Sequence, residues 1–429
     1  MMNPSLDLST KATLPMNAPI REDLEALALS YRNICVVGLG YVGLPTALLF
    51  ALHDFSVQGV DVSERVLDNI QHDRIGSVYP ELADWWQEVR AEGHFKASSK
   101  PEPADVFLIT VPTPVHHADK TCDLSMVRAA TESILPVLRP GNLVILESTV
   151  PPGTTRNVLK PLIEEKTGLR VGQDIYLCFS PERVLPGNTT YELIHNHRVI
   201  GGTTPEAAII GRTLLGQVMQ GELFITTDVS AEFCKLAENT YRDVNIALAN
   251  ELSILADEYG VDMTEARQLI NMHPRVNLLK PGIGVGGHCI AVDPWFFVEA
   301  SPINTRLIAT SRLVNDRMPD YTVQKILQAV ADIERPKVVL VGLSYKPDVA
   351  DTRESPAMRV VELLQAQTHV EVITYDPLLE DYAELTLQAV AEGADYLAVL
   401  VGHTAVLESL DLHGEPIRQV MRTPRIQVF

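Results

Sequence analysis

Basic side chains are scarce in this chain. Its 429 residues include 35 Lys and Arg against 55 Asp and Glu, which gives a formal net charge of -20. A chain this acidic repels the phosphates of nucleic acids and of anionic membrane surfaces, so both are excluded as main partners. An anionic small-molecule substrate would therefore need a locally basic pocket.

Cysteine is also rare. The five cysteines are widely scattered, with no CxxC pair and no Cys/His cluster at the spacing of metal ligands. We therefore expect no metal site. An odd, dispersed set of thiols indicates reduced cysteines in a cytoplasmic protein.

The N-terminal segment lacks a long apolar run. Residues 1–30 contain no continuous hydrophobic stretch, so they resemble neither a signal peptide nor a membrane-spanning helix. The prediction is a flexible tail over residues 1–30, clearest from Met1 to about Pro19. Beyond the tail, 46% hydrophobic and 6% aromatic residues are typical of α/β enzymes with large sheets. The chain length predicts two or three domains.

A glycine-rich turn near the start of the folded region predicts a dinucleotide site. The expected elements are a strand over 34–37, the turn Gly38-Leu39-Gly40-Tyr41-Val42-Gly43, a helix over 44–53, and a strand over 57–60 that ends at Asp61. Gly38 should make the turn, Gly40 admit the pyrophosphate, and Gly43 allow helix and strand to pack closely. Asp61 should accept hydrogen bonds from the adenosine ribose and repel a 2′-phosphate, which predicts NAD rather than NADP.

Two later strand patterns, over 106–111 and 143–146, end in loops that contain Thr113 and Thr149. Ligands of open parallel sheets bind at the carboxyl ends of the strands, so both threonines should face the cofactor. The alternative is that either threonine only caps the helix that follows it.

A cysteine lies in a loop that is unusually rich in glycine. Cys289 follows glycines at positions 282, 284, 286 and 287, and Asp293 comes four residues after it. Glycines allow a ligand to approach the backbone, and a nearby positive group could convert such a thiol into a nucleophilic thiolate. The alternative is a buried structural cysteine.

A long helix without Gly or Pro is predicted from Ser230 to Tyr259. Lys235, Asn239 and Arg242 share one stripe of this helix, at i, i+4 and i+7. The stripe is either a solvated face or, given its apolar neighbours, a buried or cleft-facing one.

The C-terminal part repeats the strand, loop, helix, strand and acid order of the first half. The strands are expected over 338–341 and 370–375, the helix over 356–367, and the acid is Asp376, but the GxGxxG pattern is missing. An ordinary dinucleotide site is therefore not expected there. The loop residues Tyr345, Lys346 and Arg353 suit stacking on a base and pairing with phosphates, or else they are surface residues.

These patterns predict an α/β protein in which two Rossmann-like doubly wound domains are joined by a helical central domain with a long connecting helix. We expect the NAD-binding domain over 31–215, the central domain with the cysteine loop over 216–320, and the C-terminal α/β domain over 321–429. A further helix over 307–331 should be kinked or broken at Pro319.

An NAD site combined with a cysteine and without zinc ligands indicates oxidation at the aldehyde level. Attack by the Cys289 thiolate gives a thiohemiacetal, hydride loss gives a thioester, and water releases an acid. Lys235 could stabilise the oxyanion or carry a proton, and Asn239 could donate to the same oxygen or hold water.

Several segments together resemble a known family. They are Val37-Gly38-Leu39-Gly40-Tyr41-Val42-Gly43-Leu44-Pro45, Glu147-Ser148-Thr149, Cys234-Lys235-Leu236-Ala237-Glu238-Asn239-Thr240, Gly286-Gly287-His288-Cys289 and Asp351-Thr352-Arg353-Glu354-Ser355. In this order, from about Asn33 to the C-terminus, they resemble the UDP-glucose/GDP-mannose dehydrogenase family, whose UDP-sugar dehydrogenases turn a C6 alcohol into a carboxylate. Segments 180–187, 242–247, 272–277 and 289–296 resemble the branch that oxidises UDP-N-acetyl-D-mannosamine for surface polysaccharide biosynthesis.

The resemblance implies two successive oxidations at one site, with two NAD consumed per sugar. It implies these catalytic residues: Cys289 as nucleophile, Lys235 as proton carrier, and Asp293, Thr149, Asn239 and Glu182 around the water that hydrolyses the thioester. The implied cofactor residues, besides the three glycines of the turn, are Tyr41, Val42, Asp61, Thr113, Thr149 and Arg353. The implied substrate residues, besides Lys235, are Arg183, Val184, Asn239, Arg242, His273, Arg275, Gly284, Tyr345 and Lys346. It also implies a homodimer in which the neighbouring subunit supplies His273 and Arg275.

Two positions depart from the family pattern. Pro186 stands where the UDP-glucose branch has a second glutamate, which favours the N-acetyl-sugar branch. The chain ends in an expected strand over 426–429, where family members continue into a turn with a basic residue that contacts substrate. Either the chain is truncated or another group serves. The alternatives to the leading prediction are a UDP-N-acetylglucosamine or UDP-glucose dehydrogenase, a two-electron dehydrogenase, and a non-catalytic nucleotide-sugar-binding homologue.

Overall fold

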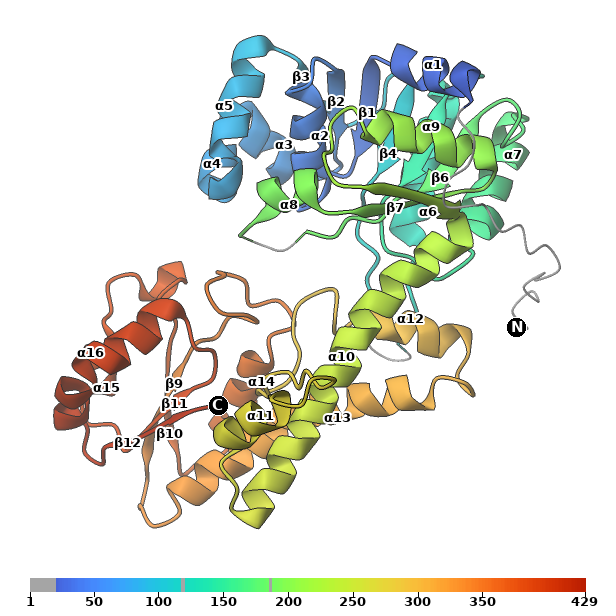
Figure 1. The fold of residues 1–429 in the computed structure, drawn as a ribbon. Coiled ribbons are helices and arrows are strands. Elements are labelled where there is room, and N and C mark those ends of the chain that lie inside the picture. The colour runs from blue at the N-terminus through green and yellow to red at the C-terminus, as the bar shows by residue number, and fades with distance from the viewer. Residues whose placement is uncertain (1–20, 117–119, 185–186) are drawn as a thin grey trace. The chain divides into compact units, whose positions relative to one another are not determined.

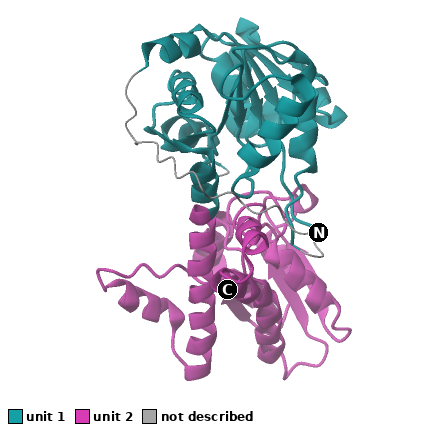
Figure 2. Cartoon of the chain, turned by 90° about the vertical axis from the view of Figure 1, so that its right-hand side faces the viewer, with its two compact units in different colours: residues 1–236 teal, residues 237–429 magenta. Residues whose placement is uncertain are grey.

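The computed structural model describes residues 21–116, 120–184 and 187–429 (Figure 1). They divide into two compact units, unit 1 up to Leu236 and unit 2 from Ala237 (Figure 2). Helix α10 (Asp228–Tyr259) begins in unit 1 and ends in unit 2. No helix of the described ranges is long and apolar enough to cross a membrane.

The described residues of unit 1 form an eight-stranded sheet with the order β3-β2-β1-β4-β5-β6-β7-β8. Neighbouring strands are parallel except for the antiparallel pair β6 and β7. The strands are β1 Asn33–Val37, β2 Ser56–Val60, β3 Phe95–Ser98, β4 Val106–Ile109, β5 Leu143–Leu146, β6 Tyr176–Phe179, β7 Arg198–Gly202 and β8 Leu223–Thr227. The order of β1 to β6 is that of a dinucleotide-binding domain.

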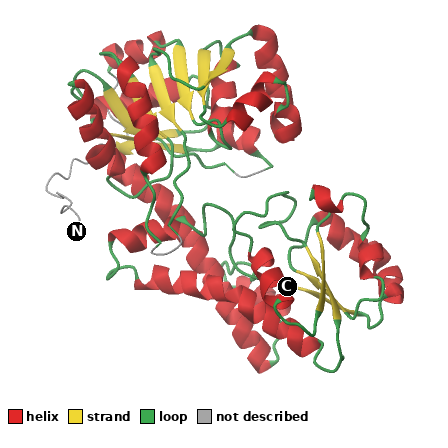
Figure 3. Cartoon of the chain, turned by 180° about the vertical axis from the view of Figure 1, so that it is seen from behind, coloured by secondary structure: helices red, strands yellow, loops and turns green. Residues whose placement is uncertain are grey.

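The helices of unit 1 cover both faces of this sheet, as Figure 3 shows. They are α1 Glu22–Ser30, α2 Gly43–Ala51, α3 Glu64–Gln71, α4 Ile75–Val78, η1 Pro80–Leu82, α5 Ala83–Glu92, α6 Ser125–Ile134, η2 Leu135–Val137, the π-helical η3 Thr155–Leu159, α7 Lys160–Thr167, α8 Thr189–His195 and α9 Pro205–Leu215. Alternate residues of β1 enter two different cores, Ile34 and Val36 on one face and Cys35 and Val37 on the other. This two-sided burial explains why the strands are continuous apolar runs.

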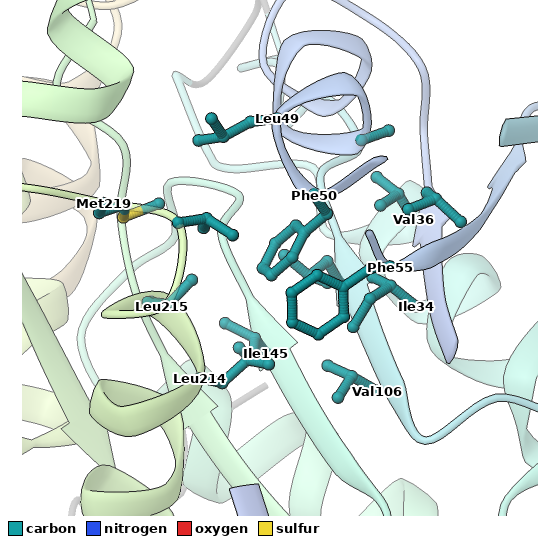
Figure 4. Packing of buried hydrophobic residues seen from close by; sticks show 14 of the residues in the cluster. Ile34, Val36, Leu49, Phe50, Phe55, Val106, Ile145, Leu214, Leu215 and Met219 are labelled. Carbon is teal, nitrogen blue, oxygen red and sulfur yellow. The ribbon is translucent and has the colours of Figure 1, made fainter. Parts of the chain in front are cut away.

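The first of these cores contains an aromatic pair. Phe50 and Phe55 meet edge to face with ring centroids 5.3 Å apart, among apolar side chains from β1, β4, β5 and α9 (Figure 4). Edge-to-face geometry is favourable for aromatic rings and adds to the gain from burying their area. The pair therefore helps to fix α2 against the sheet.

Two predicted boundaries of unit 1 are wrong. Residues 22–30 of the predicted tail form helix α1, because Leu24 and Ala28, one turn apart, are buried where α1 packs on α9. The domain boundary predicted at 215 is too early, because β8 pairs with β7 along its whole length. The remaining part of the predicted tail, residues 1–20, lies outside the described residues.

Unit 2 combines helices with a second, smaller sheet. Its helices are the remainder of α10, α11 Met263–Asn271, α12 Asp293–Ala300, α13 Arg306–Ala329, α14 Pro356–Gln365, η4 Glu380–Tyr382, α15 Leu387–Ala391 and α16 Thr404–Val420. The parallel sheet has the order β10-β9-β11-β12, made of β9 Lys337–Val341, β10 Glu371–Tyr375, β11 Tyr396–Val399 and β12 Arg425–Val428. Residues of α13 and α14 pack on one face of β9, and residues of α15 and α16 pack on the other.

Helix α13 runs through Pro319 without a break, so of the two predicted forms, kinked or broken, the broken one is wrong. Proline cannot donate a hydrogen bond to the carbonyl four residues earlier, which here belongs to Asn315. The backbone of Gly284 lies against that carbonyl, since a Cβ on Gly284 would be 3.0 Å from the Asn315 oxygen. With this exception, the observed elements confirm the predicted α/β class with two Rossmann-like sheets and helices between them in the chain.

Candidate active site

The glycine turn after β1 has the shape that a pyrophosphate needs. Gly38 adopts a φ of 95° and donates its N–H to the carbonyl of Val60 at 2.8 Å. A Cβ on Gly43 would lie 1.8 Å from the Gly38 oxygen, so only glycine fits there. By contrast, a Cβ on Gly40 would meet nothing within 4 Å, which leaves that side of the turn open. Tight packing at Gly43 and open space at Gly40 fit a bound dinucleotide.

Asp61 lies beside this turn at the end of β2. Its Oδ2 accepts the N–H of Leu39 and its Oδ1 accepts the N–H of Ser63, both at 2.8 Å. Each carboxylate oxygen can accept a second hydrogen bond, such as one from a ribose hydroxyl. Of the other predicted cofactor residues here, Val42 is the N-cap of α2, and the Tyr41 hydroxyl lies 2.6 Å from Thr189 Oγ1.

The loops after β4 and β5 are joined directly. Thr113 donates its hydroxyl to the carbonyl oxygen of Thr149 at 2.6 Å, and Ser148 donates to the carbonyl oxygen of Val111 at 2.6 Å. Neither Thr113 nor Thr149 is the N-cap of a described helix, which excludes the capping alternative. Both threonines lie in loops at the carboxyl end of the sheet, and their contact with the cofactor stays a prediction.

Lys235 and Glu182 are brought together within unit 1. The buried Lys235 donates Nζ to the carbonyl oxygen of Glu182 at 2.7 Å, and its Nζ is 3.5 Å from Glu182 Oε1. The other carboxylate oxygen of Glu182 accepts the N–H of Val184 at 2.6 Å. Arg183 directs its guanidinium to the carbonyl oxygen of His197 at 2.9 Å. Pro186 lies outside the described residues.

Asn239 and Asp293 are brought together within unit 2. Asn239 donates Nδ2 to Asp293 Oδ2 at 2.5 Å, and Asp293 is only 3% exposed. Asp293 begins α12 and donates its backbone N–H to the carbonyl oxygen of Cys289 at 2.8 Å. Cys289 itself is partly exposed, with Sγ 3.9 Å from His288 Nδ1. The backbone of Asp293 is therefore bonded to that of Cys289, and the side chain of Asp293 is bonded to that of Asn239.

The glycines of the cysteine loop pack against protein more than the sequence suggested. A Cβ on Gly286 would lie 2.6 Å from the Glu354 oxygen, and one on Gly287 would lie 2.9 Å from the Tyr345 ring. Gly284, with a φ of 127°, lies against Asn315 and Pro356, whereas Gly282 faces open space. We expected these glycines to admit a ligand. Three of the four instead allow the loop to lie flat on the segment 345–356, which places Tyr345 beside the cysteine loop.

The same segment holds Lys346 and Arg353. Tyr345 donates its backbone N–H to the carbonyl oxygen of Asp351 at 2.8 Å, and Arg353 forms a two-pronged ion pair with the Asp351 carboxylate at 2.6 and 3.0 Å. Arg353 remains 63% exposed and Lys346 is partly exposed. These contacts fix the loop while leaving cationic side chains accessible to an anion.

The acid predicted for the second sheet is not accessible to a ligand. Asp376 is fully buried, and its Oδ2 accepts the N–H groups of Leu343 and Ser344 and lies 3.1 Å from His403 Nε2. Because His403 Nδ1 accepts the N–H of Asp348, Nε2 carries the proton. Burial acts to raise the pKa of Asp376, but the hydrogen bonds from His403 and the backbone lower it below its usual value. A carboxylate used in this way has no place for a ribose, in contrast to Asp61.

The remaining predicted substrate residues lie on the surface of unit 2. His273 and Arg275 are exposed in the segment after α11, and Arg242 is exposed on α10. The predicted stripe therefore changes along the helix, from the buried Lys235 through the half-buried Asn239 to the exposed Arg242. Lys235 therefore fits the buried alternative and Arg242 the solvated one.

Sequence reasoning missed two sets of buried polar residues. Glu232, on α10, accepts hydrogen bonds from the loop after β5. In unit 2 a chain of hydrogen bonds links Arg312, Asp243, Asn315, Asn250 and the Gly282 N–H at the start of the cysteine loop. The only sequence signal was a polar residue at a helix position otherwise flanked by core residues. No group of three or more His, Cys, Asp and Glu side chains in the described ranges could hold a metal ion.

Comparison with known proteins identifies the family of the chain. Profiles of the UDP-glucose/GDP-mannose dehydrogenase family match the chain in three consecutive parts: the NAD binding domain at residues 32–229, the central domain at 229–317 and the UDP binding domain at 339–427. The chain belongs to this family. It is therefore an NAD-dependent oxidoreductase of the UDP-sugar dehydrogenase type, with two NAD used per sugar as is general for the family.

Individual relatives are similar over most of their length. The chain is 46% identical over 377 residues to a UDP-N-acetyl-D-mannosamine dehydrogenase of Methanocaldococcus jannaschii, covering 87% of this chain and 86% of the relative. It is 43% identical over 391 residues to an NDP-N-acetyl-D-galactosaminuronic acid dehydrogenase of Ralstonia solanacearum, covering 88% and 92%. A solved UDP-D-ManNAc dehydrogenase structure from Pyrococcus horikoshii is 38% identical with a TM-score of 0.86, covering 92% and 94% of the two chains.

Proposed function

We propose that this member of the family oxidises the C6 alcohol of UDP-N-acetyl-D-mannosamine to the carboxylate in two NAD-dependent steps. The support is the similarity over nearly the whole chain to UDP-N-acetyl-D-mannosamine dehydrogenases, together with the hydrogen bond between Asn239 and Asp293, four residues beyond Cys289. The product, a UDP-linked N-acetyl-mannosaminuronate, suits surface polysaccharide biosynthesis. We also infer a cytoplasmic location, supported by cysteines that form no disulfide in the described chain.

The reaction consists of two oxidations and a hydrolysis, and side chains of this protein are assigned to each step. NAD, bound at the turn after β1, supplies a hydride acceptor for each of the two oxidations. Lys235 takes the proton of the C6 hydroxyl as the alcohol becomes an aldehyde. The Cys289 thiolate then adds to the aldehyde carbon, and loss of a second hydride from the thiohemiacetal leaves a thioester. Water held by Asp293, Asn239 and Thr149 cleaves the C–S bond, which releases the acid and returns the thiol.

The contacts within each unit suit these roles. The Asn239 amide fixes the Asp293 carboxylate, which is a suitable base for a water molecule. Lys235 is held by Glu182 at the loop after β6, so its amino group is oriented before substrate arrives. Arg242, Arg275, Lys346 and Arg353 would give the diphosphate the local positive charge that a chain of net charge -20 otherwise lacks.

Stoichiometry tests the proposal. Purified protein with UDP-N-acetyl-D-mannosamine and excess NAD should form two NADH per sugar and release the uronate, measured by absorbance and by mass spectrometry of the product. One NADH per sugar would indicate a two-electron dehydrogenase, and none would indicate another substrate or a binding protein.

The second candidate substrate is a nucleotide-linked N-acetylgalactosamine sugar, favoured by the 43% identity to the Ralstonia enzyme. The two sugars differ in configuration at ring carbons, and sequence identity of this size does not separate them. A panel of UDP-N-acetylmannosamine, UDP-N-acetylgalactosamine, UDP-N-acetylglucosamine and UDP-glucose, compared by kcat/KM, distinguishes the candidates. The proposal requires the highest value for the mannosamine sugar.

We further propose a homodimer that completes the substrate site, with His273 and Arg275 supplied by the partner copy. Helix α10 exposes large apolar side chains along one face, Tyr241 at 68%, Leu248 at 51% and Leu255 at 42%. They recur every seven residues, and α11 with the segment after it adds Leu269 at 59% and Met272 at 78%. An apolar surface of this kind on a soluble domain is typical of an interface.

Charge reversal in this surface tests the dimer. Leu248→Glu should shift the protein to a monomer in sedimentation velocity and lower kcat/KM for the UDP-sugar at least about tenfold, because a charge buried in an interface costs more than about 2 kcal/mol. Leu412→Glu, at a 76% exposed leucine of α16, is the matched control and should change neither. A monomeric Leu248→Glu protein with full activity would refute the shared site.

A further inference from the structure

Helix α10 is bound to the loop after β5 by a buried carboxylate that the reaction itself does not use. Glu232 is 0% exposed. Its Oε1 accepts the N–H of Thr155 at 2.8 Å and the hydroxyl of Thr155 at 2.6 Å, and its Oε2 accepts the N–H of Gly153 at 2.5 Å. Gly153 lies in the loop after β5, and Thr155 is the first residue of η3, which follows that loop.

Burying the Glu232 side chain costs free energy of folding. Removing an ionisable group from water is unfavourable unless hydrogen bonds replace the lost hydration. Burial raises the pKa of Glu232 to about 8, with the hydrogen bonds from Thr155 and Gly153 acting in the opposite direction. The loop thus supplies the bonds that make this position tolerable for a carboxyl group. An apolar residue would fill the position without that cost, but it would not hold the loop.

The held loop is short and stiff. Between Thr149 and Gly153 lie Val150, which is fully buried, and two prolines at 151 and 152, whose φ angles are fixed. The Thr154 hydroxyl donates back to the carbonyl oxygen of Pro151 at 2.7 Å. Fixing Gly153 and Thr155 therefore also fixes the position of Thr149.

The same end of α10 carries the predicted proton carrier. Glu232 precedes Lys235 by three residues, so both lie on adjacent turns of one helix. One turn earlier, Asp228 accepts a two-pronged hydrogen bond from Arg156, with Nε to Oδ2 at 3.0 Å. Asp228 and Glu232 together hold residues 153–156 against the turns of α10 that present Lys235.

We propose that Glu232 is a positioning residue for thioester hydrolysis, which holds the Thr149 loop in register with Lys235. The inference rests on the proposed function, because it assigns Thr149 to the hydrolytic water. If the loop is loosened, the two hydride transfers at Cys289 continue, but water no longer attacks the thioester efficiently. The enzyme then accumulates as a covalent sugar thioester.

Thr155 offers a matched pair of substitutions that leaves the carboxylate in place. Thr155→Val keeps the volume but removes the hydroxyl that Glu232 Oε1 accepts, whereas Thr155→Ser keeps the hydroxyl. We expect Thr155→Val to lower kcat about tenfold, the effect of about 1.4 kcal/mol, and to form two NADH per active site in a burst before the slow steady state. Mass spectrometry of the acid-quenched protein should show the sugar adduct. Thr155→Ser should behave like the unchanged protein, and Glu232→Gln should behave like Thr155→Val with a larger loss.

Amide hydrogen exchange provides a readout that needs no turnover. Exchange at Thr149, Val150 and Gly153 should be faster in Thr155→Val and Glu232→Gln than in Thr155→Ser. Unchanged exchange at these amides would overturn the positioning role whichever sugar is the substrate. A fall in kcat without a burst or adduct would overturn the hydrolytic assignment. Failure of the unchanged protein to form NADH from UDP-N-acetyl-D-mannosamine would count against the proposed substrate only.

Discussion

Replacing Cys289 with serine will stop the four-electron reaction and leave NAD binding close to that of the unchanged protein. A serine hydroxyl is not ionised near neutral pH and is a much weaker nucleophile than a thiolate, so the aldehyde is not captured covalently. We expect kcat to fall by about a thousandfold or more, since loss of a nucleophile in a hydrolase costs about a millionfold. The sites are separate in the chain, because the glycine turn lies in unit 1 and Cys289 lies in unit 2.

The measurement is NADH formed per UDP-sugar, alongside the dissociation constant for NAD from a fluorescence titration. Cys289→Ser should form at most one NADH per sugar. Cys234→Ser, at an exposed cysteine of α10, is the matched control and should keep both values. If Cys289→Ser loses NAD affinity in proportion to kcat, the cysteine supports the fold of the cofactor site rather than the chemistry.

The cofactor half could be predicted from sequence because its determinants are local. Strand β1, the turn from Gly38 to Gly43, helix α2 and strand β2 are consecutive, and Asp61 lies at the end of the fingerprint. The close contact that requires glycine at position 43 is with Gly38 and Thr110, the first only five residues away. A short pattern of this kind contains most of the information that sets its structure.

The cysteine loop could be located from sequence but not interpreted. Glycine is needed at three of these positions because Tyr345, Glu354 and Pro356, about sixty to seventy residues later in the chain, lie too close for a side chain. Glu232 is separated by 77 residues from Thr155, and helix α1 is stable only because α9 covers Leu24 and Ala28. Such positions are set by tertiary contacts, which override local pattern and composition.

The second sheet also shows that a local sequence pattern does not predict tertiary contacts. The strand, loop, helix, strand and acid order predicted β9, α14, β10 and Asp376 correctly. The use of the acid depends on His403, which lies 27 residues beyond it and occupies the oxygen that a ribose would need. Repetition of a sequence pattern therefore predicted the repeated backbone but not a repeated cofactor site.

The largest effect on stability is expected at a buried ion pair of unit 1. Arg198, the first residue of β7, donates NH1 to Glu147 Oε1 at 3.1 Å, and the side chains are 1% and 0% exposed. Arg198→Met removes the charge and leaves Glu147 buried without compensation, which should cost about 3–5 kcal/mol of unfolding free energy. The Glu147→Gln/Arg198→Met double variant removes both charges and should recover most of the loss. Urea unfolding of the single and double variants measures both values.

The loss should depend on pH with a definite sign. Burial already raises the pKa of Glu147 above its ordinary value of 4.5, and Arg198 opposes that rise. Without Arg198 the folded-state pKa rises further, so protonated Glu147 is tolerated at low pH and the stability of Arg198→Met falls as pH rises above about 4.5. The difference from the unchanged protein should therefore be larger at pH 8 than at pH 5, and the double variant should show no such widening. If the double variant is as unstable as Arg198→Met at both pH values, the loss comes from the lost packing of the arginine side chain, and the uncompensated carboxylate is not its cause.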